Sequence, residues 1–538
     1  MWRLQFYPRH TRSISDMNNA NAKKTDLDDY QQLDRKQLFI LLLSILIVAL
    51  CAITYQLIIG TVSSYLIGNS VYQFSLTIGL FMFAMGVGSF LSKGIIRNLI
   101  SNFVFIEVVL AVIGGLSSLL LFMAFPLITA LYTMVMYALI LIIGTLVGLE
   151  LPLLTRILSH KESIRHSIAD VMSLDYVGAL IGAVIFPLFL LPQLGLVRSS
   201  FAIGLINMGV AIINIHFFRA HLQRPRLMAT ISVSMLGVLV ILTIMGTRLT
   251  SFAENNLYFD QVIFKQQTPY QRIVYTKSYA NGEKRLFLDG HVQFCDRDEY
   301  RYHEAMVHPV MSVPGPRDTI LILGGGDGLA AREVLKYEDV KQIHLVDIDP
   351  AITNFCSRFP GITKLNQGSL THPKLEIFNQ DAFTFMNQQG ILYDKVIIDL
   401  PDPHNEALNK LYTREFYKII KMRMKPHGML VTQSASPFYT RNTYWSIART
   451  IEEAALTVFS YQVTIPTFGI WGFHIGASAP LAPDDFDIQV ATRYLNNLTM
   501  QTASVFGRDI SRIEAPVNSL MEPKLYTLYV RELRGETI

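Results

Sequence analysis

The sequence predicts two different halves: an α-helical membrane bundle, then an α/β domain with a doubly wound parallel sheet and a small N-terminal β-sheet subdomain. Three observations support this fold class. Long apolar runs fill the chain up to about residue 250, short apolar strands alternate with helices after it, and a glycine-rich turn follows the first of these strands. Of 538 residues, 51% are hydrophobic and only 16% charged, against about 25% charged in ordinary soluble domains.

The apolar runs have the length of membrane spans. Each has about 20 residues, enough at about 1.5 Å per residue to cross a hydrocarbon core of about 30 Å. The window FILLLSILIVAL (39–50) lacks the polar face that a helix of a soluble protein would present to water. The seven runs lie near residues 38–60, 71–92, 103–125, 128–150, 169–192, 199–218 and 227–247.

The Lys and Arg residues near these runs do not give one consistent topology. The N-terminal tail carries seven of them, which places it in the cytoplasm. Seven crossings would then put the second half outside, whereas the chemistry argued below needs cytoplasmic substrates. We therefore predict that the run 169–192 does not cross fully, because Gly178, Gly182 and Pro187 can break a helix. Three basic residues at 219–226 disagree with this solution, and a tail outside the cell is the alternative.

Three acids interrupt the apolar half. Glu150 ends the fourth run, and Asp170 and Asp175 open the fifth. Acids at membrane depth are costly and often functional, but near a span end they can reach the interface. We favour a position at the membrane interface for Asp170. For Glu150 and Asp175, both a functional role inside the membrane and a position at the interface stay open. The small residues of DYVGALIGAVIFP (175–187) are suited to close helix packing.

The second half alternates strands and helices. A hairpin is expected first, from QRIVYTKSY (271–279) and KRLFLDG (284–290) with an Asn-Gly turn between them. Apolar strands that alternate with helices indicate a parallel, doubly wound sheet of Rossmann-like type. We expect its strands at residues 319–323, 342–349, 375–382, 395–400 and 428–434.

Acidic residues follow the expected strands at the end where such sheets bind ligands. The glycines of the turn 324–328 let a ligand approach the backbone, and Asp347 is placed to accept hydrogen bonds from a ribose. The turn is G-x-G-x-G, and Asp327 stands where a pyrophosphate would be repelled. This combination favours a cationic nucleoside without phosphate, which describes an S-adenosyl sulfonium compound.

The string Asp399-Leu400-Pro401-Asp402-Pro403 places two carboxylates after a buried strand. Solvated loop acids are one interpretation, and an acidic pocket for an amine is the other. The second is favoured because no Lys or Arg lies in the glycine turn or in residues 396–409. The acids that can face this cleft are Asp289, Asp327, Asp381, Asp399 and Asp402.

Several other classes of ligand are excluded or disfavoured. Oxygen-rich sites suit magnesium or calcium, but the chain has no EF-hand spacing or phosphate loop, and His303 and His308 are five residues apart rather than four. We therefore predict no metal. A net charge of +4 predicts no nucleic-acid partner, and three cysteines fit neither a disulfide scaffold nor a zinc pattern.

Several strings together resemble the spermidine synthases, aminopropyltransferases that use decarboxylated S-adenosylmethionine. They occur in the family's order over about 200 residues, and the apolar half resembles the membrane-fused bacterial branch of this family. The strings are YQRI (270–273), LFLDGHVQFCDRDEYRYHEAMVHP (286–309), LGGGDG (323–328), VDID (346–349), QDA (380–382), DLPDP (399–403) and IPTFGIWGF (465–473).

The resemblance implies a role for each matching residue. Asp399 resembles the general base that takes a proton from the attacking amine, and Asp402 the anchor for the far ammonium of the acceptor. His303 and Asp327 resemble the residues around the aminopropyl group and the polyamine, and Tyr302 lies beside them. Gln271, Asp347, Asp381 and Ala382 resemble the contacts to the methylthioadenosine part of the co-substrate, and Gly324, Gly326 and Asp327 are also expected to bind the co-substrate.

The chain also departs from the family's pattern. The ribose acid is Asp347 where the family usually has Glu, and Phe468 stands in place of a tyrosine. The loop DLPDPHN (399–405) lacks the family's small polar residues between the acids and its Gly-Pro. These changes leave the reaction intact and make the acceptor uncertain.

The sequence therefore predicts a multi-pass enzyme of the inner cell membrane that converts putrescine to spermidine, with the catalytic domain in the cytoplasm and putrescine or a related diamine as its partner. Decarboxylated S-adenosylmethionine is the co-substrate, no permanent cofactor is expected, and a homodimer is left open. The alternatives are an adenosylmethionine-dependent methyltransferase and a polyamine transporter or sensor. The domains expected are a disordered tail (1–36), the transmembrane domain (37–250), the β subdomain (251–317), the Rossmann-like catalytic domain (318–480) and a C-terminal extension (481–538).

Overall fold

The computed structural model describes residues 33–67, 70–127, 132–159, 164–258, 260–388 and 390–535. The chain divides into two compact units after Tyr258. The expected tail, residues 1–36, lies outside the described residues except at its end.

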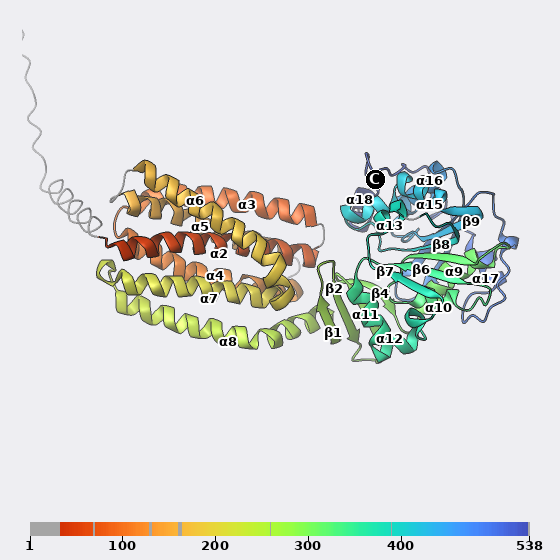
Figure 1. The fold of residues 1–538 in the computed structure, drawn as a ribbon, viewed down its shortest axis with the longest axis horizontal. Helices are drawn as coiled ribbons and strands as arrows, with labels where there is room; N and C mark the ends of the chain where they lie inside the picture. The colour runs from red at the N-terminus through yellow and green to blue at the C-terminus, as the bar shows by residue number, and fades with distance from the viewer. Residues whose placement is uncertain are drawn as a thin grey trace, which may run out of the picture. The chain divides into compact units, whose positions relative to one another are not determined.

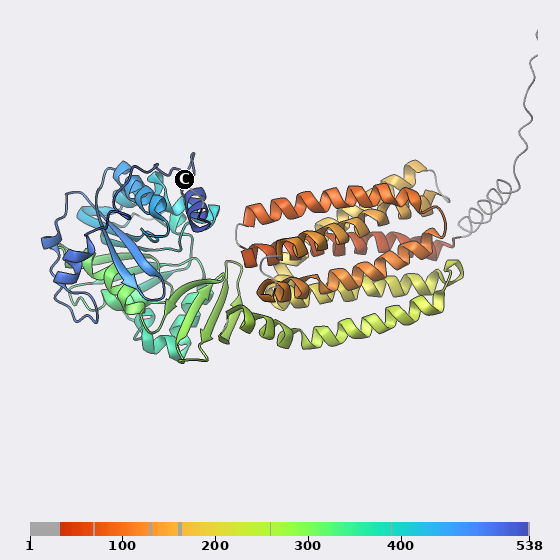
Figure 2. The same ribbon diagram turned by 180° about the vertical axis from the view of Figure 1, so that it is seen from behind.

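The first unit is a bundle of long apolar helices (Figure 1). Helix α2 runs through its middle, and Figure 2 shows the same arrangement from behind. Polar residues of α2, such as Ser44, Thr54 and Gln56, are buried together with its apolar ones, because neighbouring helices surround it. The helices are α2 (Arg35–Ile67), α3 (Ser70–Leu91), α4 (Leu99–Leu127), α5 (Tyr132–Ser159), α6 (Ile164–Ile185), α7 (Leu191–Phe217) and α8 (Pro225–Tyr258).

Among the described residues, six helical stretches are long and apolar enough to cross a membrane. The fifth of them, Ser167–Phe217, has 51 residues, which is far more than about 30 Å of hydrocarbon requires. It contains α6, a π-helical turn (Phe186–Leu190) and α7, and the backbone leaves helical geometry at Gly195, with φ 70° and ψ −178°. Since α6 and α7 both pack against α2, the chain turns back between them.

The glycines expected to break this stretch do not do so. Gly178 and Gly182 lie inside α6 and face α2, where a Cβ on Gly182 would come within 2.6 Å of the carbonyl oxygen of Leu50. They allow close helix contact, as small residues do in membrane bundles. The expected break at Gly178 and Gly182 is therefore wrong, whereas α6 does end in the π-helical turn that contains the expected Pro187, and the backbone leaves helical geometry at Gly195. That residues 169–192 fail to cross fully stays a prediction.

The second unit begins with a four-stranded antiparallel sheet in the order β1-β2-β3-β4, of which the sequence predicts the hairpin formed by β2 and β3. Its central hairpin turns at Gly282, whose φ of 75° suits the expected Asn-Gly turn. Val274 and Tyr275 of β2 are buried against the rest of the unit. The strands are β1 (Gln261–Gln267), β2 (Arg272–Lys277), β3 (Lys284–Leu288) and β4 (His291–Cys295).

The larger sheet of this unit has seven strands within the described part of the chain, in the order β10-β11-β9-β8-β5-β6-β7. The expected parallel arrangement holds for the five strands from β9 to β7, whereas β11 and β10 add an antiparallel hairpin at one edge. The sheet is therefore mixed. The strands are β5 (Thr319–Gly324), β6 (Gln342–Val346), β7 (Leu375–Phe378), β8 (Tyr393–Asp399), β9 (Met424–Gln433), β10 (Thr457–Ile465) and β11 (Gly469–Ala477).

Helices cover both faces of this sheet. On β5, Ile320 and Ile322 belong to one hydrophobic core, whereas Leu321 and Leu323 belong to another on the opposite face. This alternation is the mark of a doubly wound sheet. The helices are α9 (Glu299–Ser312), α10 (Leu329–Val334), α11 (Pro350–Arg358), α12 (Pro360–Leu365), α13 (Ala382–Gln388), α14 (Glu406–Asn409), α15 (Arg414–Met422), α16 (Arg441–Glu453), α17 (Asn497–Ala503) and α18 (Leu525–Leu533).

The strand order reverses beside β5, which has β6 on one side and β8 on the other. At this point Gly324 of β5 pairs with Asp399 of β8. Sheets of this kind bind ligands in the crevice beyond the carboxyl ends at the reversal. The predicted site residues Gly324 and Asp399 therefore lie where the reversal of strand order opens a crevice.

Candidate active site

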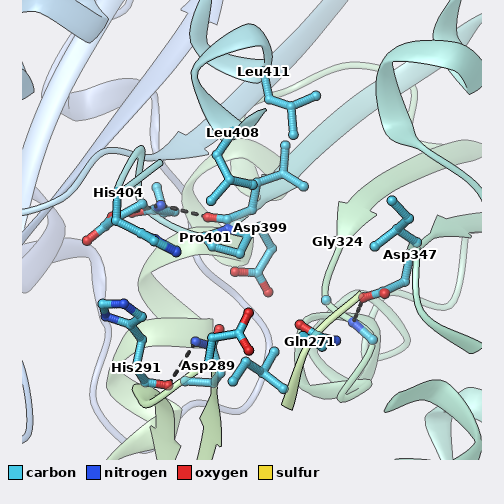
Figure 3. Close-up of a pocket in the computed structure, with 18 of the residues that line it drawn as sticks. Gln271, Asp289, His291, Gly324, Asp347, Asp399, Pro401, His404, Leu408 and Leu411 are labelled. Carbon is cyan, nitrogen blue, oxygen red and sulfur yellow. Dashed lines mark hydrogen bonds between the residues drawn. The ribbon is translucent and has the colours of Figure 1, made fainter. Parts of the chain in front are cut away.

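A pocket of about 570 Å³ opens at the carboxyl ends of β5, β6 and β8. Figure 3 shows Asp399 between two groups of lining residues, with Gln271, Gly324 and Asp347 on one side and His291 and His404 on the other. The small antiparallel sheet and helix α18 complete the wall. The pocket lies within the second unit.

Glycine is required at two positions of the turn after β5. Gly324 has φ 84°, and a Cβ there would overlap the carbonyl oxygen of Asp399. A Cβ on Gly326 would overlap the carboxylate of Asp347. That carboxylate accepts hydrogen bonds from the backbone N–H groups of Gly326, at 3.1 Å, and Asp349, at 2.9 Å. Burial raises the pKa of Asp347 to about 6, with a smaller contribution from the charge of Asp349.

A cation also faces the pocket. The His303 ring contacts the Glu299 carboxylate at 2.9 Å through Nδ1, and Arg332 bonds the same carboxylate. Burial alone would lower the pKa of His303, but the hydrogen bond and charge of Glu299 outweigh it and raise that pKa to about 9. Burial raises the pKa of nearby Asp327, whereas the charge of His303 acts to lower it. The imidazolium therefore offsets part of the pocket's negative charge.

Asp399 lies at the centre of the pocket and is only partly buried. Its Oδ1 accepts a hydrogen bond of 2.7 Å from the hydroxyl of Tyr302. Burial and then repulsion from Asp327 raise the pKa of Asp399 to about 6, against the opposing effects of His303 and Tyr302. A carboxylate with a pKa near 6 is ionised at neutral pH and is a better proton acceptor than an ordinary aspartate.

Asp402 is held by two groups that the sequence did not single out. Its Oδ1 accepts a hydrogen bond of 3.1 Å from Gln433 at the end of β9, and its Oδ2 accepts one of 2.8 Å from Tyr529 on α18. Burial raises the pKa of Asp402 to about 6 despite these bonds. Gln433 lies within an expected strand, but Tyr529 lies in the C-terminal extension, where no local signal marked it.

Two histidines line the same end of the pocket. The rings of His291 and His404 lie 4.3 Å apart between centroids, and both residues belong to the pocket wall. Burial lowers the pKa of His291, and burial together with His291 lowers that of His404 to about 4. Both rings are therefore neutral at pH 7 and offer polar contacts without repelling a cation.

The end of the pocket at Asp381 contains a cation, Lys410. This residue directly follows the range 396–409, which has no Lys or Arg. Lys410 donates to Asp381 Oδ2 at 2.7 Å, so this acid is paired rather than free. Burial would raise the pKa of Asp381, but the bond to Lys410 outweighs it and lowers that pKa. Gln271 donates to Asp349 at 3.0 Å. The expectation that all five cleft acids lack nearby bases is therefore wrong for Asp381.

All the residues predicted for the site line this one pocket, although lining alone does not establish their roles. They are Gln271, Tyr302, His303, Gly324, Gly326, Asp327, Asp347, Asp381, Ala382, Asp399 and Asp402. Asp289 and Phe468 line it too. In the described parts of the chain no group of three or more His, Cys, Asp and Glu side chains is arranged to hold a metal ion.

The fold and this pocket are typical of an α/β enzyme that binds a nucleoside-containing ligand and a cation. The Spermine/spermidine synthase domain family matches residues 299–483. A polyamine aminopropyltransferase from Leptospira interrogans is 40% identical over 493 residues, covering 91% of this chain and 98% of the relative. One from Streptomyces coelicolor is 42% identical over 503 residues, covering 90% and 93%.

The chain therefore belongs to the polyamine aminopropyltransferase family, and it is an enzyme of this activity. Among solved structures, a spermidine synthase from Thermotoga maritima is 24% identical with a TM-score of 0.42, covering 46% of this chain and 84% of that one. The relatives also cover the apolar half, since they match about nine-tenths of this chain.

Proposed function

We propose that the enzyme transfers the aminopropyl group of decarboxylated S-adenosylmethionine to putrescine, giving spermidine and methylthioadenosine. The observation that carries the proposal is Asp399, a carboxylate with a pKa near 6 that lies between the end of the pocket at Asp347 and the end at His291 and His404 (Figure 3). A carboxylate in this place lies between a nucleoside and an amine that approach each other from opposite ends.

The nucleoside is assigned to the end formed by the glycine turn. Asp347 is oriented by two backbone N–H groups and can accept hydrogen bonds from the ribose hydroxyls. Asp381 and Ala382, at the start of α13, lie at the same strand ends and are assigned to the adenine. Asp327 lines the pocket close enough to Asp399 for its charge to raise the pKa of that carboxyl, and it is assigned to the ammonium of the aminopropyl group.

In the reaction, the amine nitrogen attacks the carbon next to the sulfonium as the carbon–sulfur bond breaks. The bonding electron pair goes to sulfur, which leaves as the neutral thioether of methylthioadenosine. Asp399 accepts the proton that the amine loses, and Tyr302 orients the carboxylate through its hydrogen bond. Since the sulfonium is already a good leaving group, alignment of the two reactants contributes most, on the order of 7–11 kcal/mol.

The acceptor is assigned to the end with Asp402. Asp402 can pair with the far ammonium of a diamine, while Gln433 and Tyr529 fix the direction of its carboxylate. The neutral rings of His291 and His404 line the path beside it.

A panel of amines tests the acceptor. Purified full-length enzyme is incubated with decarboxylated S-adenosylmethionine and putrescine, cadaverine, 1,3-diaminopropane or spermidine, and the products are identified by mass. We expect the highest kcat/KM with putrescine. A higher value with spermidine would make spermine the product and reject the proposed acceptor while leaving the family activity intact.

The pH dependence of the reaction follows from the two carboxylates. We expect kcat/KM to fall as the pH falls through about 6, because Asp399 must be ionised to take a proton and Asp402 must be ionised to pair with the acceptor. Steady-state kinetics from pH 5 to pH 8 at constant ionic strength would measure it. A profile that stays flat down to pH 5 would contradict the raised pKa values.

The choice of cofactor should follow the charge of the pocket. We expect decarboxylated S-adenosylmethionine to bind at least about tenfold more tightly than S-adenosylmethionine, a difference of about 1.4 kcal/mol. Asp327 would attract an ammonium and repel the extra carboxylate. Calorimetry with both compounds measures the difference, and Asp327→Asn should narrow it. Equal affinities in the unmodified enzyme would favour the methyltransferase alternative.

We also propose that the second unit faces the cytoplasm, since putrescine and decarboxylated S-adenosylmethionine are cytoplasmic compounds. Among the described residues, six helical stretches of the first unit are long and apolar enough to cross a membrane, which indicates a multi-pass membrane protein. A cysteine introduced at exposed Tyr279, in the second unit, should resist a membrane-impermeant reagent in intact cells. Labelling from outside would reject this placement.

A further inference from the structure

The first unit contains buried polar groups that the transfer reaction does not use. Glu150 of α5 has only 2% of its surface exposed, although the sequence placed it at a span end where it could reach the interface. Glu107 of α4 is completely buried, and the sequence analysis did not single it out. The two acids within α6 differ from them, because Asp170 is exposed and Asp175 is half-buried.

Glu107 is fixed by residues of two other helices. Asn214 of α7 donates to its Oε2 at 3.2 Å and also bonds Ser44 of α2 at 3.0 Å. Asn207 of α7 donates to the backbone carbonyl of Glu107, also at 3.2 Å. One carboxylate is therefore held in place by hydrogen bonds that join α2, α4 and α7.

The cluster has more acceptors than donors. Among the described residues, both carboxylate oxygens of Glu150, Oε1 of Glu107 and Oδ1 of Asn207 are buried without a hydrogen-bond partner. The charged groups that interact with Glu150 include Glu107 and Asp175, both acids. An unpaired polar group in an apolar interior is costly, and acids inside membranes usually mark functional sites.

We propose that Glu107 and Glu150 form a binding site for an alkylammonium ion inside the helical bundle. An ammonium group supplies three N–H donors, which suits several unpaired oxygens on different helices. Calcium takes six to eight oxygen ligands, and the described residues hold no group of three or more metal-ligating side chains. This site is separate from the catalytic pocket and goes beyond the proposed function.

Equilibrium binding of radiolabelled putrescine tests the site in the purified full-length chain in nanodiscs. Asp402→Asn serves as the background, because it weakens the acceptor end of the catalytic pocket. We expect saturable binding in Asp402→Asn and its loss in Asp402→Asn/Glu150→Gln. Asp402→Asn/Asp170→Asn is the matched control and should still bind, since Asp170 is an exposed acid of the same bundle.

Transfer activity reports whether the chain with the single change Glu150→Gln is folded. Its kcat and KM should equal those of the unmodified enzyme, because Glu150 does not line the catalytic pocket. The proposal is overturned if Asp402→Asn shows no saturable binding, or if Glu150→Gln leaves that binding unchanged. Displacement of the label by equimolar sodium would assign the site to an inorganic cation and also overturn the proposal. A wrong acceptor assignment would appear only in the transfer assay, so the two failures are distinguishable.

Discussion

Asp399→Asn should lower kcat by at least about 10²-fold, within the range that general bases contribute, while the protein keeps its fold. The amide preserves the shape of the side chain, and its oxygen can still accept the hydrogen bond from Tyr302. It cannot accept a proton from the amine. Single-turnover kinetics with saturating substrates and a thermal melt would measure both parts of the expectation.

The matched control is Asp289→Asn in the wall of the same pocket. The Oδ1 atom of Asp289 accepts a hydrogen bond of 2.8 Å from the backbone N–H of Arg272, which an asparagine oxygen can also accept. We expect only a small change in kcat there. Similar losses in both variants would point to the pocket's total charge rather than to proton transfer, and near-normal turnover of Asp399→Asn would reject the assignment of the base.

Asp402→Asn should raise the KM for putrescine by about 30-fold or more, while kcat at saturating amine changes less. Loss of one member of a desolvated charge pair costs about 2 kcal/mol or more. Initial rates over a wide putrescine range, with decarboxylated S-adenosylmethionine saturating, would separate KM from kcat. Tyr529→Phe keeps the carboxylate but removes one of its hydrogen bonds, so a smaller rise in KM is expected there.

The stability of Asp402→Asn provides an independent check of the same carboxyl group. The folded-state pKa of Asp402, about 6, lies above the usual value near 3.9 of an unfolded chain. Its contribution to folding stability is therefore present at low pH and lost as the pH rises through about 6. Asp402→Asn without ligand should melt no lower than the unmodified enzyme at pH 8, and a clear loss of Tm there would contradict the pKa.

The parts of the fold with a strong local pattern could be predicted from the sequence. The apolar runs became long helices, and the strand that ends at Asp399 followed from its buried hydrophobic residues. Gly178 and Gly182 allowed two predictions that exclude each other, a broken helix and a close contact between two helices. Only the neighbouring helix decides between them, and the sequence does not say which helix that is. The edge hairpin of β10 and β11 was missed because the sequence does not say which strands pair with each other.

The candidate site divides in the same way. The acids that follow strands, such as Asp347 and Asp399, could be placed because parallel strands all present their carboxyl ends at one edge of the sheet. Tyr529 lies 127 residues after Asp402 and Lys410 lies 29 residues after Asp381, and these contacts leave no periodic signal in the sequence. Glu107 was missed because a single acid hardly changes the hydropathy of an apolar run.

The pocket draws its walls from chain segments as far apart as Gln271 and Tyr529. Contacts of such sequence separation form slowly, because long loops must close before the contacts stabilise the chain. Recovery of transfer activity after unfolding should therefore follow the last cooperative step of folding in the second unit, well after helical structure returns. The enzyme's own turnover is then a kinetic probe of complete folding, to which partly folded intermediates contribute no signal.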